Sequence, residues 1–524
     1  MQLTGKNLIG NKLSGINPQS FKGHGGHSGI AFHEATVGEV DQAVNIAHKA
    51  FGNYKNTSGV ERAIFLERIA QLIDENKGEL VAIAMTESRL PEGRLMGETG
   101  RTTGQLKLFA SLLREGSWVN AMIDPAIPDR QPLPKPDVRQ MQRPLGPVAV
   151  FGASNFPFAF STAGGDTASA LAAGCPVVCK AHPGHPATSE LVASLIIQAG
   201  NDTGMPEGVF SLVQGEGYEA SVHLVSHPAI KAVGFTGSLG GGRALFNAAA
   251  KRNEPIPVYA EMGSVNPVFV LPEILEKEAT ALGQKLAGSN LMGAGQFCTN
   301  PGVIVAVKSK AQEQFTEAFK TALEAASADN MLTEKVFSGY CSNLGKMASL
   351  RGVAQLVGDL TAKEGVAAIP HMFQVEASAF VNNPALQEEV FGPSSLHVLA
   401  DGETQMQQVA DILHGQLTAS VWGTEKDMKG HSELIGTLES KAGRVIFNAP
   451  PTGVEVTYAM VHGGPYPATT DSRSTSVGTN AIYRFTRAVC YQGYHQALLP
   501  EALLDANPLS ITRKVNGQFT DKAL

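Results

Sequence analysis

One residue of this sequence that could do chemistry is a cysteine in a glycine-rich segment. Residues 293–299 read GAGQFCT, and Cys298 is the sixth of these seven residues. An ionised thiol is a strong nucleophile, and small neighbours let a substrate come close to it. On the residue chemistry alone, a buried and unreactive thiol is the commoner alternative. We expect that role for Cys175 and Cys179, which flank an apolar run.

Two glycine-containing turns are candidates for binding the phosphates of a nucleotide. Residues 234–242 read GFTGSLGGG, where backbone N–H groups and the Ser238 hydroxyl could meet a pyrophosphate at a helix N-terminus. A merely tight turn is the alternative. Residues 215–220 match G-x-G-x-x-A but lack the acidic residue expected about 20 positions later. Lys180, after the run PVVC, could reach a ribose or phosphate, although most strand-end lysines are simply solvated.

Four histidines have spacings that occur in metal sites: His182, His185, His223 and His227. In the sequence no cysteine or carboxylate completes a ligand set with them, and the His223–His227 pair lacks the glutamate of the metalloprotease motif. We therefore predict ordinary surface histidines and no metal.

Helices are expected in the first part of the chain. Thr36 and Glu39 form a capping-box signature, after which apolar residues recur at helical spacing. A second helical block runs from about residue 61 to 113 and is broken near Pro91. The first hundred residues are therefore predicted to be mainly helical.

From Pro147 the pattern changes to short apolar runs without alternation: PVAVFG, PVVCK, VFSLV, AVGFTG, PVYAEMG and PVFVL. Such runs, with helix-length stretches between them, are typical of parallel strands covered on both faces. We predict a doubly wound α/β domain. The residues that follow each run then deserve inspection, because ligands bind beyond the carboxyl ends of such strands.

We expect an α/β protein with three parts. Residues 1–122 and 148–263 would form a doubly wound, dinucleotide-binding domain, and residues 264–470 a second α/β domain that carries the nucleophile. Residues 123–147 are crowded with prolines, which disfavour helix and central strand alike. Together with residues 483–524 they would form a small oligomerisation arm and C-terminal tail.

The bulk composition is that of a globular protein. The chain has 524 residues, 43% of them hydrophobic and 17% charged, which is enough for more than one core. A net charge of −7 and scattered basic residues argue against nucleic acid as a partner. Five cysteines without a disulfide spacing, and an N-terminus without a basic and then apolar segment, favour a reducing cytoplasm. No stretch approaches the roughly 18 apolar residues of a membrane helix, so no membrane association is expected.

Six motifs resemble those of the aldehyde dehydrogenase superfamily, in the same order along the chain from about Thr36 to at least Gly464. They are the N-F-P motif at 155–157, the strand-end Lys180, F-T-G-S at 235–238, EMGS at 261–264 in place of E-L-G-G, G-Q-x-C at 295–298 and E-x-F-G-P at 389–393.

The resemblance implies catalytic roles for three residues. Cys298 would attack the aldehyde carbon, and the Asn155 amide with the Cys298 backbone N–H would stabilise the oxyanion. Glu261 would activate water against the resulting thioester. Relatives that pass the acyl group to coenzyme A lack this glutamate, so such an enzyme is a disfavoured alternative. A non-catalytic structural relative is disfavoured too, because both Cys298 and Glu261 are present.

The resemblance also implies a nicotinamide cofactor, NAD or NADP, and no metal. Its contacts would come from Lys180, Phe235, Gly237, Ser238, Gly242, Glu389 and Phe391. Many members that prefer NAD carry an acidic residue three positions after the strand-end lysine, where this chain has Pro183. Nothing in the motif repels a 2′-phosphate, so we expect NADP to be accepted, and a preference for NADP is the hypothesis to test.

Three segments resemble the branch that oxidises 2,5-dioxopentanoate (α-ketoglutarate semialdehyde) to 2-oxoglutarate: FGASNFPFAFS at 151–161, AGGDT at 163–167 and HGGPYP at 462–467. NADP-dependent long-chain fatty aldehyde dehydrogenases share much of this pattern and remain the alternative. Where succinic semialdehyde dehydrogenases carry an arginine for the substrate carboxylate, this chain has Ala163. The substrate-contact candidates are Arg101, Phe156, Thr452, His462 and Arg473. The resemblance further implies a homodimer or homotetramer.

Overall fold

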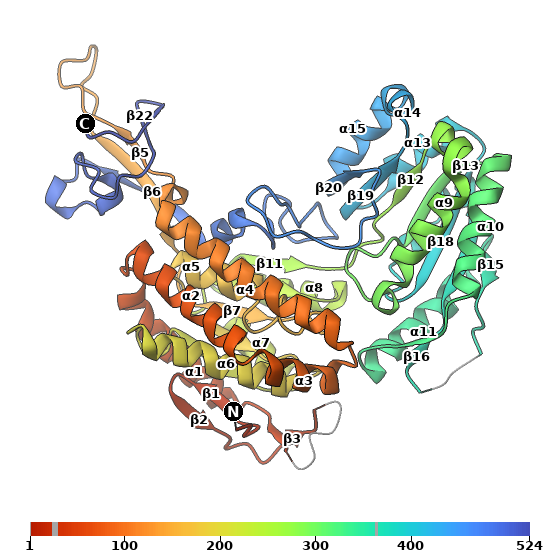
Figure 1. Ribbon diagram of the computed structural model, residues 1–524. Coiled ribbons are helices and arrows are strands. Elements are labelled where there is room, and N and C mark those ends of the chain that lie inside the picture. Colours follow the sequence, from red (N-terminus) through yellow and green to blue (C-terminus); the bar gives the residue numbers. More distant parts are fainter. Residues whose placement is uncertain (1, 24–29, 362–364) are drawn as a thin grey trace.

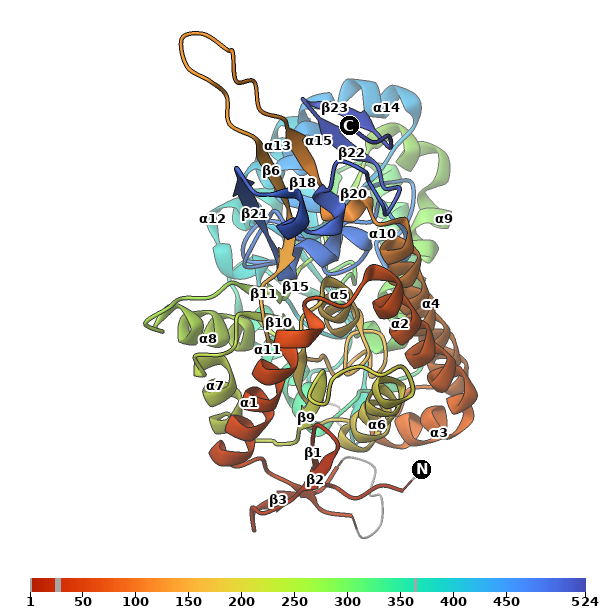
Figure 2. The same cartoon turned by 90° about the vertical axis from the view of Figure 1, so that its left-hand side faces the viewer.

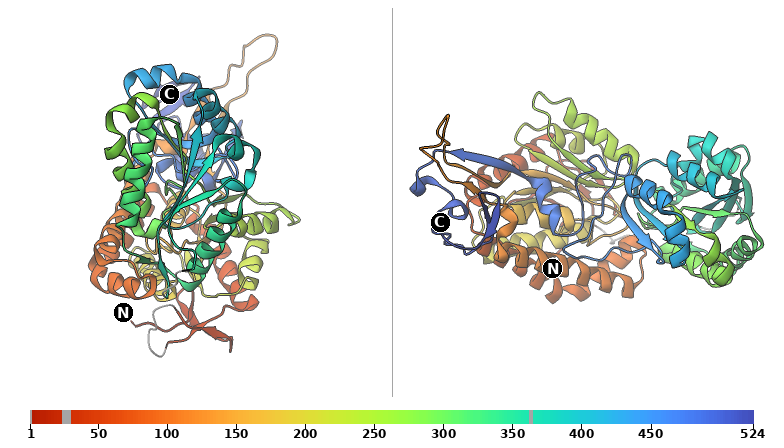
Figure 3. Two further views of the ribbon diagram at one scale, coloured as in Figure 1. Left: turned by 90° about the vertical axis from the view of Figure 1, so that its right-hand side faces the viewer. Right: turned by 90° about the horizontal axis from the view of Figure 1, so that it is seen from above.

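Two large sheets flanked by helices, and a smaller sheet at one end, make up the computed structural model, which describes residues 2–23, 30–361 and 365–524 (Figure 1). The expected α/β class is confirmed. Seen from above, the small sheet and the second large sheet lie at opposite ends, with the first large sheet between them (Figure 3). No described helix has the length and apolar character needed to cross a membrane.

The first sheet has the strand order β11-β10-β7-β8-β9-β1-β2. Its parallel strands are β7 (Val148–Phe151), β8 (Val177–Lys180), β9 (Phe210–Val213), β10 (Ala232–Thr236) and β11 (Val258–Glu261). The connecting helices are α5 (Gly165–Ala173), α6 (Pro186–Asp202), α7 (Glu219–Ser226) and α8 (Leu239–Ala250). When the five parallel strands are numbered 1 to 5 along the chain, they lie side by side in the order 3-2-1-4-5, which is typical of nucleotide-binding folds.

The N-terminal segment adds strands that the helical pattern did not predict. β1 (Asn7–Ile9) and β2 (Lys12–Ser14) extend the first sheet antiparallel beyond β9, and β3 (Ser20–Phe21) pairs with β4 (Phe32–His33). Strands this short carry too few residues to show alternation. They lie at the end of the molecule opposite the loop between β5 (Met122–Asp124) and β6 (Val138–Pro144) (Figure 2).

The N-terminal helices pack beside this sheet: α1 (Val37–Tyr54), α2 (Gly59–Glu75), α3 (Lys77–Ser88) and α4 (Glu92–Glu115). The capping box at Thr36 and Glu39 is present in full. The second block is broken at Pro91 as predicted, and also at Asn76, where the chain leaves helical geometry.

The second sheet has the order β15-β17-β18-β13-β12-β19-β20. Its strands are β12 (Val268–Val270), β13 (Val303–Val307), β15 (Ala354–Val357), β17 (His371–Glu376), β18 (Ser394–Ala400), β19 (Gln416–Trp422) and β20 (Ala442–Phe447). Its helices are α9 (Pro272–Leu291), α10 (Lys310–Glu324), α11 (Glu334–Ser349), α12 (Ala377–Asn382), α13 (Glu403–Ile412), α14 (Glu425–Gly430) and α15 (Ser432–Lys441). A two-stranded pair, β14 (Asp329–Asn330) and β16 (Ala367–Ala368), stands apart.

The small sheet joins the expected arm to the C-terminal tail. Its order is β21-β6-β5-β22-β23, with β5 (Met122–Asp124), β6 (Val138–Pro144), β21 (Thr486–Gln492), β22 (Arg513–Val515) and β23 (Gln518–Thr520). Our expectation that the whole proline-rich stretch excludes a central strand is wrong for β6 and for the end of β5, because both strands pair on two sides. The prolines crowd the loop between these strands, and β6 itself has a proline only at its last residue.

Short 3₁₀ helices complete the fold: η1 (Ser117–Val119), η2 (Met292–Gly295), η3 (Pro384–Gln387), η4 (Thr479–Phe485), η5 (Gln496–Leu498) and η6 (Glu501–Leu503). The chain crosses from the first to the second large sheet between β11 and β12. It returns through the segment after β20, where Thr469 forms a bridge with Glu261. The candidate site lies at this double crossing.

Candidate active site

The loop that carries Cys298 has an unusual backbone. Gly293, Ala294 and Gly295 all have left-handed φ angles, of 58°, 54° and 64°. A Cβ on Gly295 would lie 2.2 Å from the Gly392 carbonyl, so only glycine fits there. This close approach brings the G-Q-x-C segment against the E-x-F-G-P segment, which are far apart in the sequence.

Asn266 lies in the segment between β11 and β12 and forms hydrogen bonds to the loop that carries Cys298. Its side-chain Nδ2 donates to the carbonyls of Cys298 (2.8 Å) and Asn300 (2.9 Å). Its Oδ1 accepts from Ser264 Oγ at 3.0 Å, and Asn266 itself is fully buried with a left-handed φ of 46°. Sequence reasoning missed this residue because no motif marks a lone buried asparagine.

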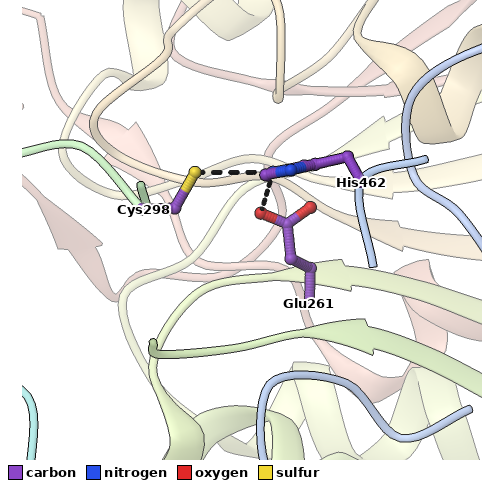
Figure 4. Close-up of side chains that lie close together, drawn as sticks. All are labelled: Glu261, Cys298 and His462. Carbon is purple, nitrogen blue, oxygen red and sulfur yellow. Dashed lines mark hydrogen bonds and ion pairs between the residues drawn. The ribbon is translucent and has the colours of Figure 1, made fainter. Parts of the chain in front are cut away.

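Three side chains from distant segments meet at the nucleophile (Figure 4). His462 Nε2 lies 3.5 Å from Cys298 Sγ and 2.8 Å from Glu261 Oε1, so the imidazole edge stands between thiol and carboxylate. The Ser476 hydroxyl donates to the other carboxylate oxygen, Oε2. His462 is fully buried and Glu261 almost so. An ionised Glu261 accepts the N–H of His462 Nε2, so the acceptor for a proton that leaves Sγ is the Glu261 carboxylate.

The electrostatics of this cluster oppose a free thiolate and favour an ionised glutamate. Burial, followed by the neighbouring Glu261 carboxylate, raises the pKa of the Cys298 thiol well above its ordinary value. Burial also acts to raise the pKa of Glu261, but His462 and Ser476 outweigh it, and the net shift is downward. The resting state is therefore a neutral thiol beside a carboxylate that can accept a proton.

Cysteine, histidine and glutamate are also the side chains that bind zinc. Their three ligand atoms lie within 4.8 Å of one another, which makes this the place in the described structure where a cation could be held. The sequence prediction of no metal had considered only the histidine spacings near residues 182 and 223. It remains a prediction.

Asn155 follows β7 and faces the nucleophile loop. Its side-chain Nδ2 donates to the Gln296 carbonyl at 3.0 Å, two residues before Cys298. Arg94 donates to the Asn155 carbonyl at 2.8 Å, and Glu98 accepts from the N–H groups of Phe158 and Ala159. Two residues of α4 therefore fix the loop that presents the Asn155 amide.

A pocket of about 390 Å³ opens in front of Cys298. One wall is the face of α4 that carries Arg94, Glu98 and Arg101, and the others are residues 453–455 and the rings of Phe156, Phe160 and Phe297. Arg94 stacks between Phe156 and Phe297, 4.6 Å from each ring centre. The pocket therefore combines apolar walls with two guanidinium groups, and the carboxyl groups of Glu98 and Glu455 line it as well.

Arg101 is the unusual group of this pocket. Its guanidinium lies 4.9 Å above the Phe160 ring, and its Nε makes a long contact of 3.4 Å to the Val454 carbonyl. Its two terminal nitrogens are shielded from solvent and find no hydrogen-bond partner among the described residues. Burial lowers the pKa of Arg101, a shift opposed by Glu98 and Cys298. A buried guanidinium in this state would bind an anion.

The structure separates the five substrate-contact candidates. Arg101 and Phe156 line the pocket, and His462 lies in the Cys298 cluster behind it. Thr452 is bonded to Ser289 at 2.7 Å, directly before the lining segment. Arg473 does not reach the pocket: its side chain is 88% exposed and pairs with Asp471 on the surface.

Four of the seven residues expected to contact the cofactor lie where β10 ends and α8 begins: Phe235, Gly237, Ser238 and Gly242. Ser238 caps α8 by accepting from the Gly241 N–H, and a Cβ on Gly237 would collide with the Phe235 ring at 2.7 Å. A Cβ on Gly242 would meet Met262 Sδ at 2.6 Å. The turn needs its glycines and leaves the N-terminus of α8 open to a pyrophosphate, which fits the chemistry of the group.

The other cofactor candidates lie on both sides of the nucleophile. Lys180 ends β8, is buried, and donates to the Gly215 carbonyl. Glu389 and Phe391 line a smaller cavity beside Ser264 and Gly295. Burial raises the pKa of Glu389 to about 8.

The histidines flagged by spacing have ordinary partners. His223 pairs with Asp41 at 2.6 Å, and His227 lies 3.7 Å from the same carboxylate. His185 is a correction to the predicted surface position: it is fully buried and bonds to the Ala153 carbonyl at 2.9 Å. The sequence could not show that α6 turns its first residues into the core.

Comparison with known proteins agrees with this geometry. The chain belongs to the aldehyde dehydrogenase family, whose family model matches residues 18–486. It is similar to "Alpha-ketoglutaric semialdehyde dehydrogenase" of Acinetobacter baylyi, 50% identical over 94% of each chain. It is also similar to "Alpha-ketoglutaric semialdehyde dehydrogenase 2" of Azospirillum brasilense, 46% identical over 99% of this chain and 100% of the other.

Solved structures share the fold at low identity. Aldehyde dehydrogenase 21 from Physcomitrella patens, solved with the reaction product succinate, has a TM-score of 0.79 at 19% identity over 95% of this chain and all of its own. A 3,6-anhydro-L-galactose dehydrogenase also has a TM-score of 0.79, at 20% identity over 93% of this chain and 99% of its own. The expected family is confirmed, and with it an oxidoreductase that acts on an aldehyde.

Proposed function

We propose that the protein oxidises 2,5-dioxopentanoate to 2-oxoglutarate, with NAD or NADP as hydride acceptor. The observation that carries the substrate is Arg101, an unpaired buried guanidinium in the pocket that ends at Cys298. 2,5-Dioxopentanoate has an aldehyde at one end and a carboxylate at the other. The names of the two relatives above support the same substrate.

The substrate carboxylate would pair with Arg101 and place the aldehyde at the nucleophile. Leaving a buried charge unpaired costs roughly 3–5 kcal/mol, so an anion that completes the pair gains affinity that a neutral aldehyde cannot. The phenyl rings of Phe156, Phe160 and Phe297 exclude water from the intervening carbons. The pairing with Arg101 and the contact with the phenyl rings would together select a short aldehyde that also carries a carboxylate.

In the acylation step, Cys298 Sγ would attack the aldehyde carbon while its proton passes to the neighbouring Glu261 carboxylate. His462 Nε2, 2.8 Å from Glu261 Oε1, would donate its N–H to that carboxylate and hold it beside the thiol. The Asn155 amide would donate to the oxygen that becomes negative as the S–C bond forms. The cofactor, when bound, supplies the acceptor for the hydride that leaves the same carbon, and a thioester on Cys298 remains.

In the deacylation step, Glu261 would take a proton from water as its oxygen attacks the thioester carbon. Glu261 is ionised for this step because it has released the thiol's proton to solvent. The C–S bond then breaks and returns the thiolate, which recovers a proton from Glu261. Glu261 suits this role because its lowered pKa keeps it ionised at neutral pH. The product is the free carboxylate, and coenzyme A is not required.

The cofactor would be held by the seven residues named in the sequence analysis. Ser238 and the glycines beside it would meet the pyrophosphate, and Lys180 the ribose on the adenine side. Glu389 and Phe391 would hold the nicotinamide ribose and ring.

Two broader expectations also belong to this proposal. We place the protein in the cytoplasm, because its five cysteines are all unpaired. We expect a homodimer or homotetramer that uses the small sheet.

The test compares three aldehydes: 2,5-dioxopentanoate, succinic semialdehyde and a long-chain aldehyde. Each is mixed with the purified protein and NAD or NADP, and the absorbance of the reduced nicotinamide is followed, with Cys298→Ala as the blank. We expect the highest kcat/KM for 2,5-dioxopentanoate and none in the variant. A preference for the long-chain aldehyde would overturn the substrate, and activity in the variant would overturn the nucleophile.

A further inference from the structure

A carboxylate from the N-terminal segment lies at the carboxyl ends of β8 and β9. Glu34, just before α1, accepts from the backbone N–H groups of Glu216 (2.7 Å) and Gly217 (3.1 Å) through Oε1. Its Oε2 accepts no hydrogen bond from the described residues. A Cβ on Gly215 would lie 2.8 Å from Glu34 Oε2 and 3.7 Å from Lys180 Cε. The Glu34 carboxylate and the Lys180 side chain therefore both lie beside Gly215 and form one small patch.

This patch lies where the fold recognises a ribose. In a 3-2-1-4-5 sheet, the residues that read the adenosine 2′ position stand at the end of the second strand. Here the second strand is β8, and it ends at Lys180. An acidic group at that place accepts a hydrogen bond from the 2′-hydroxyl of NAD, whereas NADP presents a phosphate there.

We propose that Glu34 supplies the acidic group that the motif lacks at Pro183, so that the site binds NAD in preference to NADP. This inference rests on the proposed cofactor role of Lys180. It replaces the hypothesis of an NADP preference, which considered only residues near Lys180 in the sequence. The missing carboxylate comes from a segment almost 150 positions earlier and enters beside the strand end.

The charges around the patch support this assignment. A phosphate on the ribose adds about −1.5 to −2 charges and would meet the Glu34 carboxylate. The Lys180 ammonium already donates to the Gly215 carbonyl and interacts with the Glu34 carboxylate, so its attraction for a phosphate is partly satisfied before a cofactor binds. Lys335 of α11 is the competing cation: its ammonium is 3.5 Å from the Tyr218 hydroxyl and could turn toward a phosphate. How closely the Lys335 ammonium can approach the 2′-phosphate determines how strongly NADP is disfavoured.

The test is equilibrium binding of NADH and NADPH, followed by the fluorescence of the reduced nicotinamide and without any aldehyde. Wild-type protein should bind NADH more tightly than NADPH. Glu34→Gln keeps an oxygen to accept the two N–H groups but removes the charge, so its affinity for NADPH should rise by about tenfold. NADH affinity should change by less than about threefold, since a neutral amide can still accept from a hydroxyl.

Glu207→Gln is the matched control. Like Glu34, Glu207 accepts a backbone N–H, in this case that of Asn11. Glu207 precedes β9, so it lies at the amino ends of the parallel strands, away from the proposed ribose site. It changes the net charge equally and should alter neither affinity.

Two results would overturn the proposal: wild-type protein that binds NADPH as tightly as NADH, or an unchanged NADPH affinity in a folded Glu34→Gln protein. The first needs no variant, so the proposal stays testable even if Glu34→Gln fails to fold. Because no aldehyde is present, the result is independent of whether 2,5-dioxopentanoate is the substrate.

Discussion

At the scale of single residues, the chemistry depends on how the Cys298 thiol loses its proton. The thiol is buried beside a carboxylate, and both conditions disfavour the thiolate. The same carboxylate, held by the N–H of His462 Nε2, can accept the thiol proton at the moment of attack. The cluster therefore protects the thiol at rest and activates it when substrate is bound.

This arrangement predicts a high apparent thiol pKa in the free enzyme. The alkylation rate of Cys298 by iodoacetamide should still be rising above the ordinary thiol value of about 8.5. Glu261→Gln removes the neighbouring charge and should move the midpoint of the profile to lower pH. The background should be Cys341→Ser with Cys490→Ser, because Cys490 is exposed and Cys341 is partly exposed like Cys298, so both would react with the reagent. A rate that has levelled off by about pH 7 would contradict the assignment.

Arg101→Met should separate binding of the carboxylate from catalysis. It keeps the apolar stem but removes the charge, so KM for 2,5-dioxopentanoate should rise by about 100-fold or more. KM for pentanal, which has no carboxylate, should change by less than about threefold. Steady-state kinetics on the two aldehydes give both values.

Arg473→Met is the control for Arg101, since that side chain is exposed on the surface, and it should leave both constants unchanged. An equal rise of KM for both aldehydes in Arg101→Met would show that Arg101 only shapes the pocket.

The sequence was informative about residues wherever chemistry required a motif. Cys298, Glu261 and Asn155 were chosen from motifs, and the structure brings them together from three segments. His462 was assigned only as a substrate contact, because its distance to Cys298 depends on the return of the chain after β20. Glu34 and Asn266 carry no motif, and their positions follow from tertiary packing alone.

At the scale of elements, the active site depends on two loops that touch through a glycine. Gly295→Ala would place a Cβ 2.2 Å from the Gly392 carbonyl, and the φ angle of 64° at this position is one that alanine rarely adopts. The nucleophile loop must therefore move. A displacement of about 1 Å at a nucleophile typically costs on the order of 100-fold in rate. We expect a folded protein with at least that loss of kcat.

Gly288→Ala is the matched control. Gly288 lies in α9, one turn or more before the same loop, and a Cβ there meets nothing within 4 Å. This change should preserve kcat and raise the free energy of unfolding by about 0.5–1 kcal/mol. Kinetics together with thermal unfolding separate the two variants, and full activity in Gly295→Ala would contradict the close approach.

β7, β8, β9 and β12 were predictable because each is buried on both faces and so appears as an unbroken apolar run. β1, β2, β5 and β6 were not predicted, since the first three are too short to show a pattern and β6 follows a proline-rich loop. Short edge strands depend on their neighbours more than on their own residues.

At the scale of the whole molecule, the small sheet at one end of the chain has an open edge at β21. This strand pairs only with β6 among the described residues, and most of its side chains are exposed in the single chain. An open strand edge readily pairs with another chain. Light scattering should therefore give a mass of two or four times the chain mass of 55.1 kDa.

Lysine on this edge should weaken the association. Ala488→Lys combined with Cys490→Lys places two charges on exposed positions of β21. The mass should then fall toward that of one chain. A wild-type mass of one chain would contradict the proposed role of the arm.

The most direct test of the central claim is to trap the acyl intermediate on the nucleophile. Glu261→Gln should form the thioester and hydrolyse it slowly, because the group that activates water is gone while Cys298 remains. The variant is mixed with 2,5-dioxopentanoate and NAD, quenched in acid, digested and analysed by mass spectrometry. We predict the acyl adduct on the peptide that contains Cys298, formed together with one equivalent of reduced cofactor. Reduced cofactor without an adduct on Cys298, or an adduct on another residue, would contradict the account.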